Sequence, residues 1–155
     1  MDSLLEQRVK ILAVASGGGH WEQLMLLRSA MDRHDVLYGT TTVGLAKRDG
    51  LDDVVYLPDC SRSSISKALK CLIASWKLVR SVKPDVVITT GALPGLFCLV
   101  IARLGGARTV WIDSLANFEK PSMSGKFAGY FSTLWLTQWE NLARPNGPHY
   151  FGRLF

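Results

Sequence analysis

Short apolar runs and longer amphipathic segments alternate along this chain. The apolar runs predict β-strands over residues 9–15, 35–42, 53–57, 85–89, 109–112 and 133–137. Helical spacing predicts helices over residues 20–32, 64–82 and 93–104, and a short helix from Gly125. Ser63 or Ser64 is the expected N-cap of the second of these helices. Nearly continuous apolar strands between helices indicate an α/β fold, a Rossmann-like parallel sheet flanked by helices on both faces.

Length and composition suit one globular domain. The 155 residues, 48% hydrophobic and 20% charged, predict a single domain over residues 1–155 with no second domain. The most apolar stretch, residues 92–104, is shorter than the roughly 20 residues that a membrane-spanning helix needs, so we expect it to be buried. The three cysteines lie far apart and form no C-x-x-C pair, which predicts neither a zinc site nor a disulfide framework and favours a reducing cytoplasmic compartment.

The charge balance points to acidic partners. A formal net charge of +5 and a pI of about 9.3 favour phosphates, nucleic acid or an anionic membrane surface, without choosing among them.

A glycine turn joins the first predicted strand to the first predicted helix. It consists of Ser16, Gly17, Gly18 and Gly19, with His20 and Gln23 following. Glycines let the backbone approach a ligand, and the first N–H groups of a helix favour an anion. A dinucleotide-binding turn is disfavoured, because Glu22 occupies the third glycine position and no carboxylate follows the second strand. The turn therefore indicates another anion or sugar-phosphate site, or it serves only to pack the strand on the helix.

Three loops should meet at the carboxyl edge of the sheet, where parallel α/β sheets bind ligands. They cover residues 16–19, 90–94 and 113–124. They bring together candidate groups that include Thr90, Gly91, Asp113 and Ser114, with Ser124 and Lys126 at the end of the third loop. At a helix N-terminus His20 should be neutral, as a general base requires, although it could also only cap or pack the helix. Asp113 could orient a hydroxyl or act as the base, and Lys126 could meet a phosphate.

The helix over residues 64–82 carries an apolar stripe and a basic flank. The stripe comprises Ile65, Leu69, Leu72, Ile73, Trp76 and Val79, and the flank comprises Lys67, Lys70, Lys77 and Arg80. One interpretation is an ordinary core stripe beneath a solvated basic face. The other is contact with anionic lipid head groups. At the chain end, an apolar tail from Trp139 to Phe155 predicts docking, either on the chain itself or on a partner.

Taken together, several of these segments resemble a known family. The glycine turn followed by Gln23-Leu24, the segment from Thr90 to Pro94, the segments beginning at Ile112 and Ser122, and Gln138-Trp139 resemble bacterial polysaccharide biosynthesis glycosyltransferase subunits of the PssD type. These are similar to the membrane-anchor, acceptor-side subunit of the split eukaryotic N-acetylglucosaminyltransferase. The resemblance implies the N-terminal half-domain of a GT-B fold.

The resemblance also implies an activity. Such a subunit would bind a polyprenyl-diphosphate-linked saccharide, the lipid-linked acceptor, while a separate donor-binding subunit, docked by the C-terminal tail, supplies a UDP-sugar for exopolysaccharide or capsule assembly. His20 would be the catalytic base, with Asp113 as the other candidate. No metal, cofactor or nucleic acid is expected. The chain would lie in the cytoplasm, peripherally at the inner face of the plasma membrane, with Lys67, Lys70, Trp76, Lys77 and Arg80 as its contact.

Two other functions remain as alternatives. One is a non-catalytic membrane adaptor that recruits the catalytic donor-binding subunit, in which His20 would not affect turnover. The other is a nucleotide-binding oxidoreductase, against which the missing third glycine and the missing ribose-binding acid argue.

Overall fold

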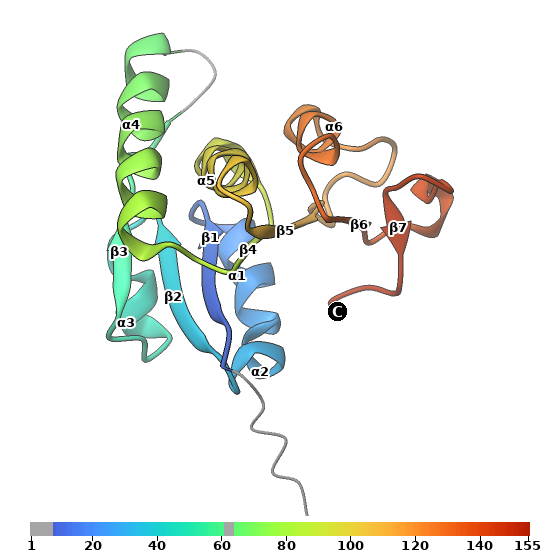
Figure 1. Ribbon diagram of the computed structural model, residues 1–155. Coiled ribbons are helices and arrows are strands. Elements are labelled where there is room, and N and C mark those ends of the chain that lie inside the picture. Colours follow the sequence, from blue (N-terminus) through green and yellow to red (C-terminus); the bar gives the residue numbers. More distant parts are fainter. Residues whose placement is uncertain (1–7, 61–63) are drawn as a thin grey trace, which may run out of the picture.

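The sheet forms the centre of the computed structural model, which describes residues 8–60 and 64–155 (Figure 1). Within those residues seven parallel strands follow the order β3-β2-β1-β4-β5-β6-β7. Their bounds are β1 Lys10–Ala15, β2 Asp35–Thr40, β3 Val54–Tyr56, β4 Val86–Thr89, β5 Arg108–Ile112, β6 Leu134–Thr137 and β7 His149–Tyr150. The predicted α/β fold with a parallel sheet is confirmed.

Helices cover both faces of this sheet (Figure 1). One layer holds α4, α5 and α6, and the other holds α1, α2 and α3. The helix bounds are α1 Gly19–Leu26, α2 Arg28–Met31, α3 Leu45–Arg48, α4 Ile65–Val82, α5 Ala92–Leu104 and α6 Met123–Gly129, with a 3-10 turn at Glu140–Leu142. Ser64 is the N-cap of α4 and makes no side-chain capping hydrogen bond, whereas the alternative cap Ser63 lies outside the described residues.

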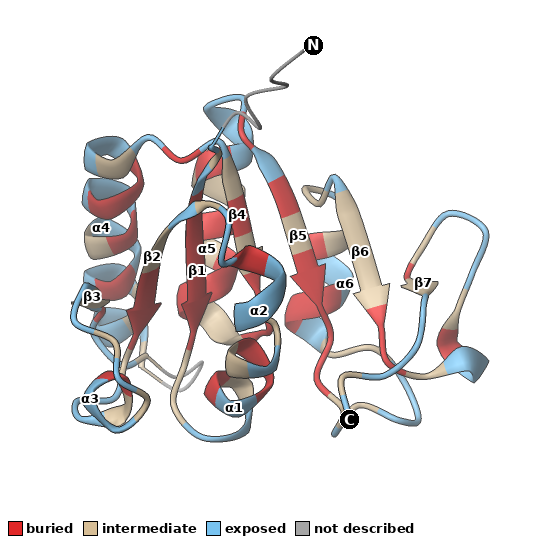
Figure 2. Ribbon diagram, turned by 90° about the horizontal axis from the view of Figure 1, so that it is seen from below, coloured by how far each residue is buried: buried red, intermediate tan, exposed pale blue. Residues whose placement is uncertain are grey.

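The central strand β1 explains why the strands are apolar on both sides. Leu12 and Val14 pack in the core beneath α4, α5 and α6. Ile11 and Ala13 pack in the core on the side of α1, α2 and α3. The buried colouring of β1 in Figure 2 shows the same arrangement. In a strand that is buried on both faces, apolar residues do not alternate with polar ones. The sequence therefore shows continuous apolar runs.

Three elements differ from the sequence-based prediction. The helix expected over residues 20–32 is divided at Leu27 into α1 and α2. The helix α3 and the strand β7 were not predicted at all. Both are four residues or fewer, too short to carry a period of their own, and tertiary contacts form them. The two residues of β7 pair with Leu136 and Thr137 of β6.

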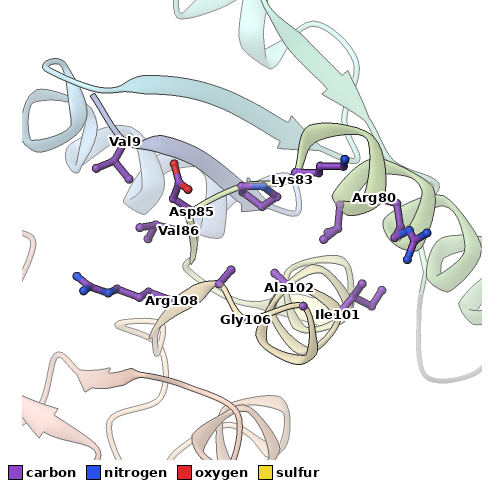
Figure 3. Close-up of a pocket in the computed structure, with 13 residues that line it drawn as sticks. Val9, Arg80, Lys83, Asp85, Val86, Ile101, Ala102, Gly106 and Arg108 are labelled. Carbon is purple, nitrogen blue, oxygen red and sulfur yellow. The ribbon is translucent and has the colours of Figure 1, made fainter. Parts of the chain in front are cut away.

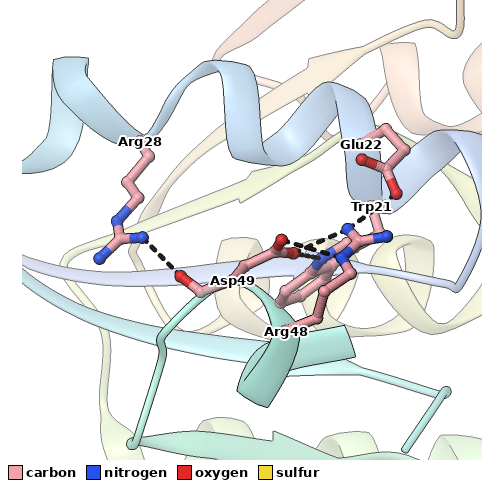
Figure 4. Close-up of polar contacts among 5 residues, drawn as sticks. All are labelled: Trp21, Glu22, Arg28, Arg48 and Asp49. Atoms are coloured by element: carbon pink, nitrogen blue, oxygen red, sulfur yellow. Dashed lines mark hydrogen bonds and ion pairs between the residues drawn. The ribbon is translucent and has the colours of Figure 1, made fainter. Parts of the chain in front are cut away.

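A polar cluster fastens α3 against α1 (Figure 4). The indole Nε1 of Trp21 donates to Asp49 Oδ2 at 2.6 Å. Arg48 lies between Glu22 and Asp49, with N···O distances of 2.8 and 2.9 Å, and Arg28 donates to the backbone carbonyl of Asp49. The Arg48 guanidinium and then the Trp21 indole lower the pKa of the Asp49 carboxyl. The segment between β2 and α3 is thereby held beside the glycine turn, where Thr41 Oγ1 accepts from the backbone N–H of Gly17.

The orientation of α4 contradicts the predicted core stripe. Ile65 is 87% exposed and Trp76 is 51% exposed, and Leu69, Leu72 and Ile73 are exposed with them. The residues that α4 buries are Cys71, Ser75, Leu78 and Val79, so only Val79 of the predicted stripe lies in the core. Small side chains at Cys71 and Ser75 let α4 approach the rest of its layer closely, and this leaves the larger apolar residues facing outward.

The most apolar segment, residues 92–104, is buried as predicted. Helix α5 buries Leu96, Cys98, Leu99 and Ala102 in the core. Among the residues that the structure describes, no helix combines the length and the apolar character needed to cross a bilayer.

Candidate functional site

The candidate site lies where the strand order changes direction. Strand β1 has β2 on one side and β4 on the other, and Val14 pairs in register with Thr89. The chain therefore turns away from β1 in both directions, and a crevice opens beyond the carboxyl ends of the strands at such a point. The loops after β1, β4 and β5 meet there, as the sequence predicts.

His20 is held by the loop after β4. Its Nδ1 lies 2.8 Å from the backbone carbonyl of Thr90, and Thr90 Oγ1 donates to the carbonyl of His20 at 2.6 Å. A carbonyl oxygen can only accept, so this contact requires the imidazole proton on Nδ1. The neutral ring then has an acceptor at Nε2, the atom that a general base needs.

Asp113 is a buried carboxylate at the carboxyl end of β5, with 2% of its surface exposed. Its Oδ1 accepts from Ser122 Oγ at 2.7 Å and from Asn117 Nδ2 at 3.3 Å, and its Oδ2 accepts from the Ser122 backbone N–H. Burial raises the pKa of the Asp113 carboxyl above its ordinary 3.8, and the bonds from Ser122 oppose that rise. Ser122 also caps α6, because its Oγ accepts from the Gly125 N–H.

A hollow of about 190 Å³ separates these groups. Its lining comes from all three loops: His20, Gly91, Ala92, Asp113, Ser114, Ala116, Asn117, Ser122 and Ser124. The structure thus brings His20, Gly91, Asp113, Ser114 and Ser124 of the predicted residues around one space. An imidazole whose Nε2 faces no hydrogen-bond partner among the described residues and a buried carboxylate on one cavity are suited to accept a proton from a hydroxyl and to orient that hydroxyl.

Other predicted residues lie beside the hollow rather than in its wall. Thr90 is buried behind His20, and Gln23 is buried on α1, where it bonds to Ser114. Ser16, Gly17, Gly18 and Gly19 form the turn next to His20 and do not line the hollow. Lys126 is exposed on α6 and does not line it either.

At two positions a neighbouring side chain lies so close to the backbone that only glycine fits. At Gly91, φ is +134° and an added Cβ would lie 2.6 Å from His20 Cε1. At Gly125, an added Cβ would lie 2.6 Å from Asp113 Oδ2. Each therefore leaves room for one of the two candidate catalytic side chains.

Sequence reasoning did not select Asn117 and Ser122 as site residues, although both bond to the Asp113 carboxylate. Ser122 lies in the segment that the sequence singles out, but Ser124 and Lys126 were chosen there. No periodic signal marks a loop residue that turns back onto a strand end, because only the folded loop brings them together.

A larger hollow, of about 920 Å³, lies at the opposite, amino-terminal edge of the sheet (Figure 3). Val9, Asp85 and Arg108 line it near the starts of strands, with Arg80 and Lys83 from the end of α4. Arg80 and Arg108 lie at opposite ends of it and do not converge on a common point (Figure 3). Its size exceeds that of the first hollow, but it lacks a convergent set of polar groups, so we place the chemistry at the carboxyl edge.

Within residues 8–60 and 64–155, no three His, Cys, Asp or Glu side chains gather as a metal site requires.

The residues predicted to contact a membrane lie on the exposed side of α4. Lys67, Lys70, Trp76, Lys77 and Arg80 are all exposed. The guanidinium of Arg80 lies 5.5 Å from the centre of the Trp76 ring. They share this helix with the exposed apolar residues described above.

Comparison with known sequences supplies a family. The family described as "Oligosaccharide biosynthesis protein Alg14 like" matches residues 57–154. A human protein named UDP-N-acetylglucosamine transferase subunit ALG14 is 25% identical over 176 residues, which cover 92% of this chain and 81% of the human protein. The rat protein of the same name is 25% identical and covers 88% of this chain and 78% of its own length.

Comparison with solved structures supplies the fold. MurG of Acinetobacter baumannii superposes with a TM-score of 0.72 at 14% identity, covering 92% of this chain and 45% of MurG. A UDP-GlcNAc 2-epimerase from Neisseria meningitidis, solved with UDP-GlcNAc bound, gives a TM-score of 0.67 at 11% identity, covering 85% of this chain and 41% of the epimerase. The chain therefore spans less than half the length of these enzymes. The predicted fold, the N-terminal Rossmann-like half of a GT-B architecture, is confirmed.

Proposed function

The chain belongs to the family of Alg14-like oligosaccharide biosynthesis proteins, and from this premise we propose that it is the acceptor-binding subunit of a two-chain glycosyltransferase. A separate subunit would bind the UDP-sugar donor. One observation supports the division: the relatives are named as subunits of a UDP-N-acetylglucosamine transferase.

The observation that carries a catalytic role is the geometry of His20. Its Nδ1 is committed to the Thr90 carbonyl, so Nε2 is the available acceptor. In the proposed reaction, an acceptor hydroxyl in the hollow gives its proton to Nε2 as its oxygen bonds to the anomeric carbon of the donor sugar. The bond from that carbon to the UDP oxygen breaks, and UDP leaves with the electron pair.

Asp113 takes the orienting role in this proposal. Its oxygens already accept bonds from Ser122 and Asn117, which hold the carboxyl in place at the wall of the hollow. The same carboxyl is the second candidate for the base, because it lies in the wall of the hollow and burial raises its pKa above the ordinary 3.8. The glycine turn, with Ser16 to Gly19 next to His20, would meet the diphosphate of the acceptor.

The exposed face of α4 is the proposed membrane contact. Apolar side chains project outward there, with Lys67, Lys70, Lys77 and Arg80 on the same helix. A helix that combines exposed apolar residues with cations suits an anionic lipid surface, where the lipid-linked acceptor resides. A peripheral position at the inner face of the plasma membrane follows from this proposal, and exopolysaccharide or capsule assembly stays a prediction from the resemblance.

A non-catalytic adaptor is the alternative. The exposed α4 face and the exposed tail would serve a recruiting protein equally well. The two functions differ in one respect, because only the enzyme subunit needs the imidazole of His20.

The experiment compares His20→Ala with the native chain, each co-purified with the donor-binding subunit in membranes. Transfer from UDP-N-acetylglucosamine and other UDP-sugars to extracted polyprenyl-diphosphate saccharides is measured. We expect the variant to lose roughly 10²-fold or more in kcat, the usual contribution of a general base. His34→Ala, at the turn before β2, is the matched control and should retain transfer. Full transfer by His20→Ala would contradict the base and support the adaptor or Asp113.

A further inference from the structure

A buried glutamine connects the end of the chain to the candidate site. Gln138 follows β6 directly and is 2% exposed, and its amide reaches three segments of the chain. Its Nε2 donates to Gln23 Oε1 and to the Asp113 backbone carbonyl, the latter at 3.0 Å. Its Oε1 accepts from the backbone N–H of Leu154 at 3.1 Å. The partners lie on α1, at the end of β5 and in the tail.

Gln23 extends the connection to the glycine turn. Its Nε2 donates to the carbonyl of Gly19 and to Ser114 Oγ, both at 3.1 Å, and its Oε1 accepts from the Leu115 N–H. Gln23 is 5% exposed. The two amides therefore hold the residue before His20 and the loop after Asp113 in one hydrogen-bonded arrangement.

Only one orientation of the Gln138 amide satisfies these contacts. The Asp113 carbonyl can only accept, so the amide nitrogen must face it. A flipped amide would place oxygen against two acceptors, and its nitrogen would face the Leu154 N–H. When the Gln138 amide nitrogen donates to Gln23 and Asp113, the Gln138 amide oxygen therefore accepts from the backbone N–H of Leu154.

The tail also contacts Trp139, which bonds to the loop after Asp113. Arg153 lies 4.3 Å from the centre of the Trp139 ring, and the Trp139 indole donates to the carbonyl of Leu115 at 2.8 Å. Phe151 and Phe155 are exposed, so the tail presents apolar side chains outward while its backbone bonds inward.

We propose that Gln138 is a positioning residue through which seating of the C-terminal tail, residues 151–155, sets the geometry of the acceptor site. A donor-binding subunit that binds the tail would fix the position of the Leu154 N–H. Because this N–H bonds to the Gln138 amide, the amide would be fixed as well, and with it the positions of Gln23 and of the Asp113 backbone. Subunit docking and acceptor binding would thereby reinforce each other, because coupling between two binding sites is reciprocal. This inference rests on the proposed function.

Two substitutions separate the two halves of the connection. Gln138→Glu keeps the shape and the oxygen that accepts from Leu154, but it removes the donor to Gln23 and Asp113. Leu154→Pro removes the tail N–H and also fixes φ at that position, and Leu154→Ala, which keeps the N–H, controls for loss of the leucine side chain. Leu154 lies in the tail, outside every regular element, so its variants should fold even if Gln138→Glu does not.

In the reconstituted complex we expect Gln138→Glu to lower kcat on the order of tenfold or more, with donor KM unchanged, because buried acceptors lose their donor. Leu154→Pro should lower kcat severalfold relative to Leu154→Ala. The double variant should be no slower than Gln138→Glu alone, because both substitutions act on one connection. Additive losses, or equal activity of Leu154→Pro and Leu154→Ala, would overturn the proposal.

A second measurement does not depend on transfer. Hydrogen exchange of the Leu154 amide in the native chain should be slower than that of Phe155, and Gln138→Leu should abolish the difference. Equal exchange in the native chain would overturn the inference even if the enzyme is active. A native complex that transfers no sugar, with the Leu154 amide protected, would instead count against the proposed function and leave the hydrogen-bonded connection in place.

Discussion

At the scale of single residues, the backbone around His20 decides which imidazole nitrogen can react. The Thr90 carbonyl takes Nδ1, and Gly91 leaves the space that the ring occupies. A tight packing of this kind lets a change in a neighbouring residue alter the chemistry without touching the imidazole itself.

Gly91→Ala should displace the ring. An added Cβ would meet His20 Cε1 at 2.6 Å, and φ of +134° is strained for alanine. Gly106→Ala is the matched control, because Gly106 has φ of +93° with open space around its Cβ position at the far edge of the sheet. Both should lose stability, by about 1–2 kcal/mol for the strain alone. Only Gly91→Ala should lose transfer activity, which is measured in the reconstituted complex. Circular dichroism during unfolding measures the stability of both variants.

Asp113 should make the free energy of unfolding depend on pH. Burial raises the pKa of its carboxyl in the folded state above the ordinary 3.8, so the folded chain binds this proton more tightly than the unfolded chain. Stability from this group therefore falls as pH rises through the window between 3.8 and the folded-state pKa, and then levels off. Denaturant unfolding at a series of pH values should show the fall in the native chain and not in Asp113→Asn. An identical pH dependence in both proteins would contradict the raised pKa.

Residue identities suggested the chemistry of the site only in part. His20 and Asp113 could be chosen because each follows an apolar strand and carries a titratable group. Asn117 and Ser122 could not, because their role depends on a loop that returns to the Asp113 carboxylate.

At the scale of elements, the exposed face of α4 is the feature with a direct test. Replacing Leu69, Ile73 and Trp76 together by serine should weaken binding to vesicles that contain anionic lipid, by about tenfold for each apolar side chain that enters the bilayer interface. Co-sedimentation with the vesicles measures this binding. Val43→Ser, which removes an exposed apolar side chain near α3, is the control and should bind as the native chain does. Because these side chains are exposed, unfolding should change little.

The basic flank of the same helix should make that binding sensitive to salt. Lys67→Glu with Lys77→Glu should reduce binding further, since each cation near an anionic surface contributes about 1 kcal/mol and salt screens the attraction. Unchanged vesicle binding in both the apolar and the charge-reversed variants would contradict a membrane role for α4.

The strands buried on both faces and the helices α4 and α5 were predicted correctly, whereas the side of α4 that faces the core was not. Strands buried on both faces produce continuous apolar runs, which no other element of this length explains well. Helix α4 carries two apolar faces, and the sequence favoured the one with larger side chains. The small residues Cys71 and Ser75 face the core instead, which only the packing against α5 decides.

At the scale of the whole molecule, the tail is the predicted surface for the partner subunit, and its Phe151 and Phe155 are exposed. Deleting residues 151–155 should weaken binding of the donor-binding subunit at least tenfold, because the exposed Phe151 and Phe155 would be lost. Isothermal titration with the purified subunit measures the change. The serine variants of α4 should keep native affinity and serve as the control. Equal affinity of the truncated and native chains would place the partner surface elsewhere.

The sequence by itself determined the α/β class, the order of the long elements and the glycine turn, since each depends on local periodicity or on residues adjacent in the chain. It also marked the three loops that meet, because parallel strands share one carboxyl edge. The tertiary structure alone decided which side of α4 is exposed, which atom of His20 is free, and that Gln138 joins the tail to the site. Those features depend on contacts between residues such as Gln138, Gln23 and Leu154, which lie far apart in the chain and meet only after the sheet has formed.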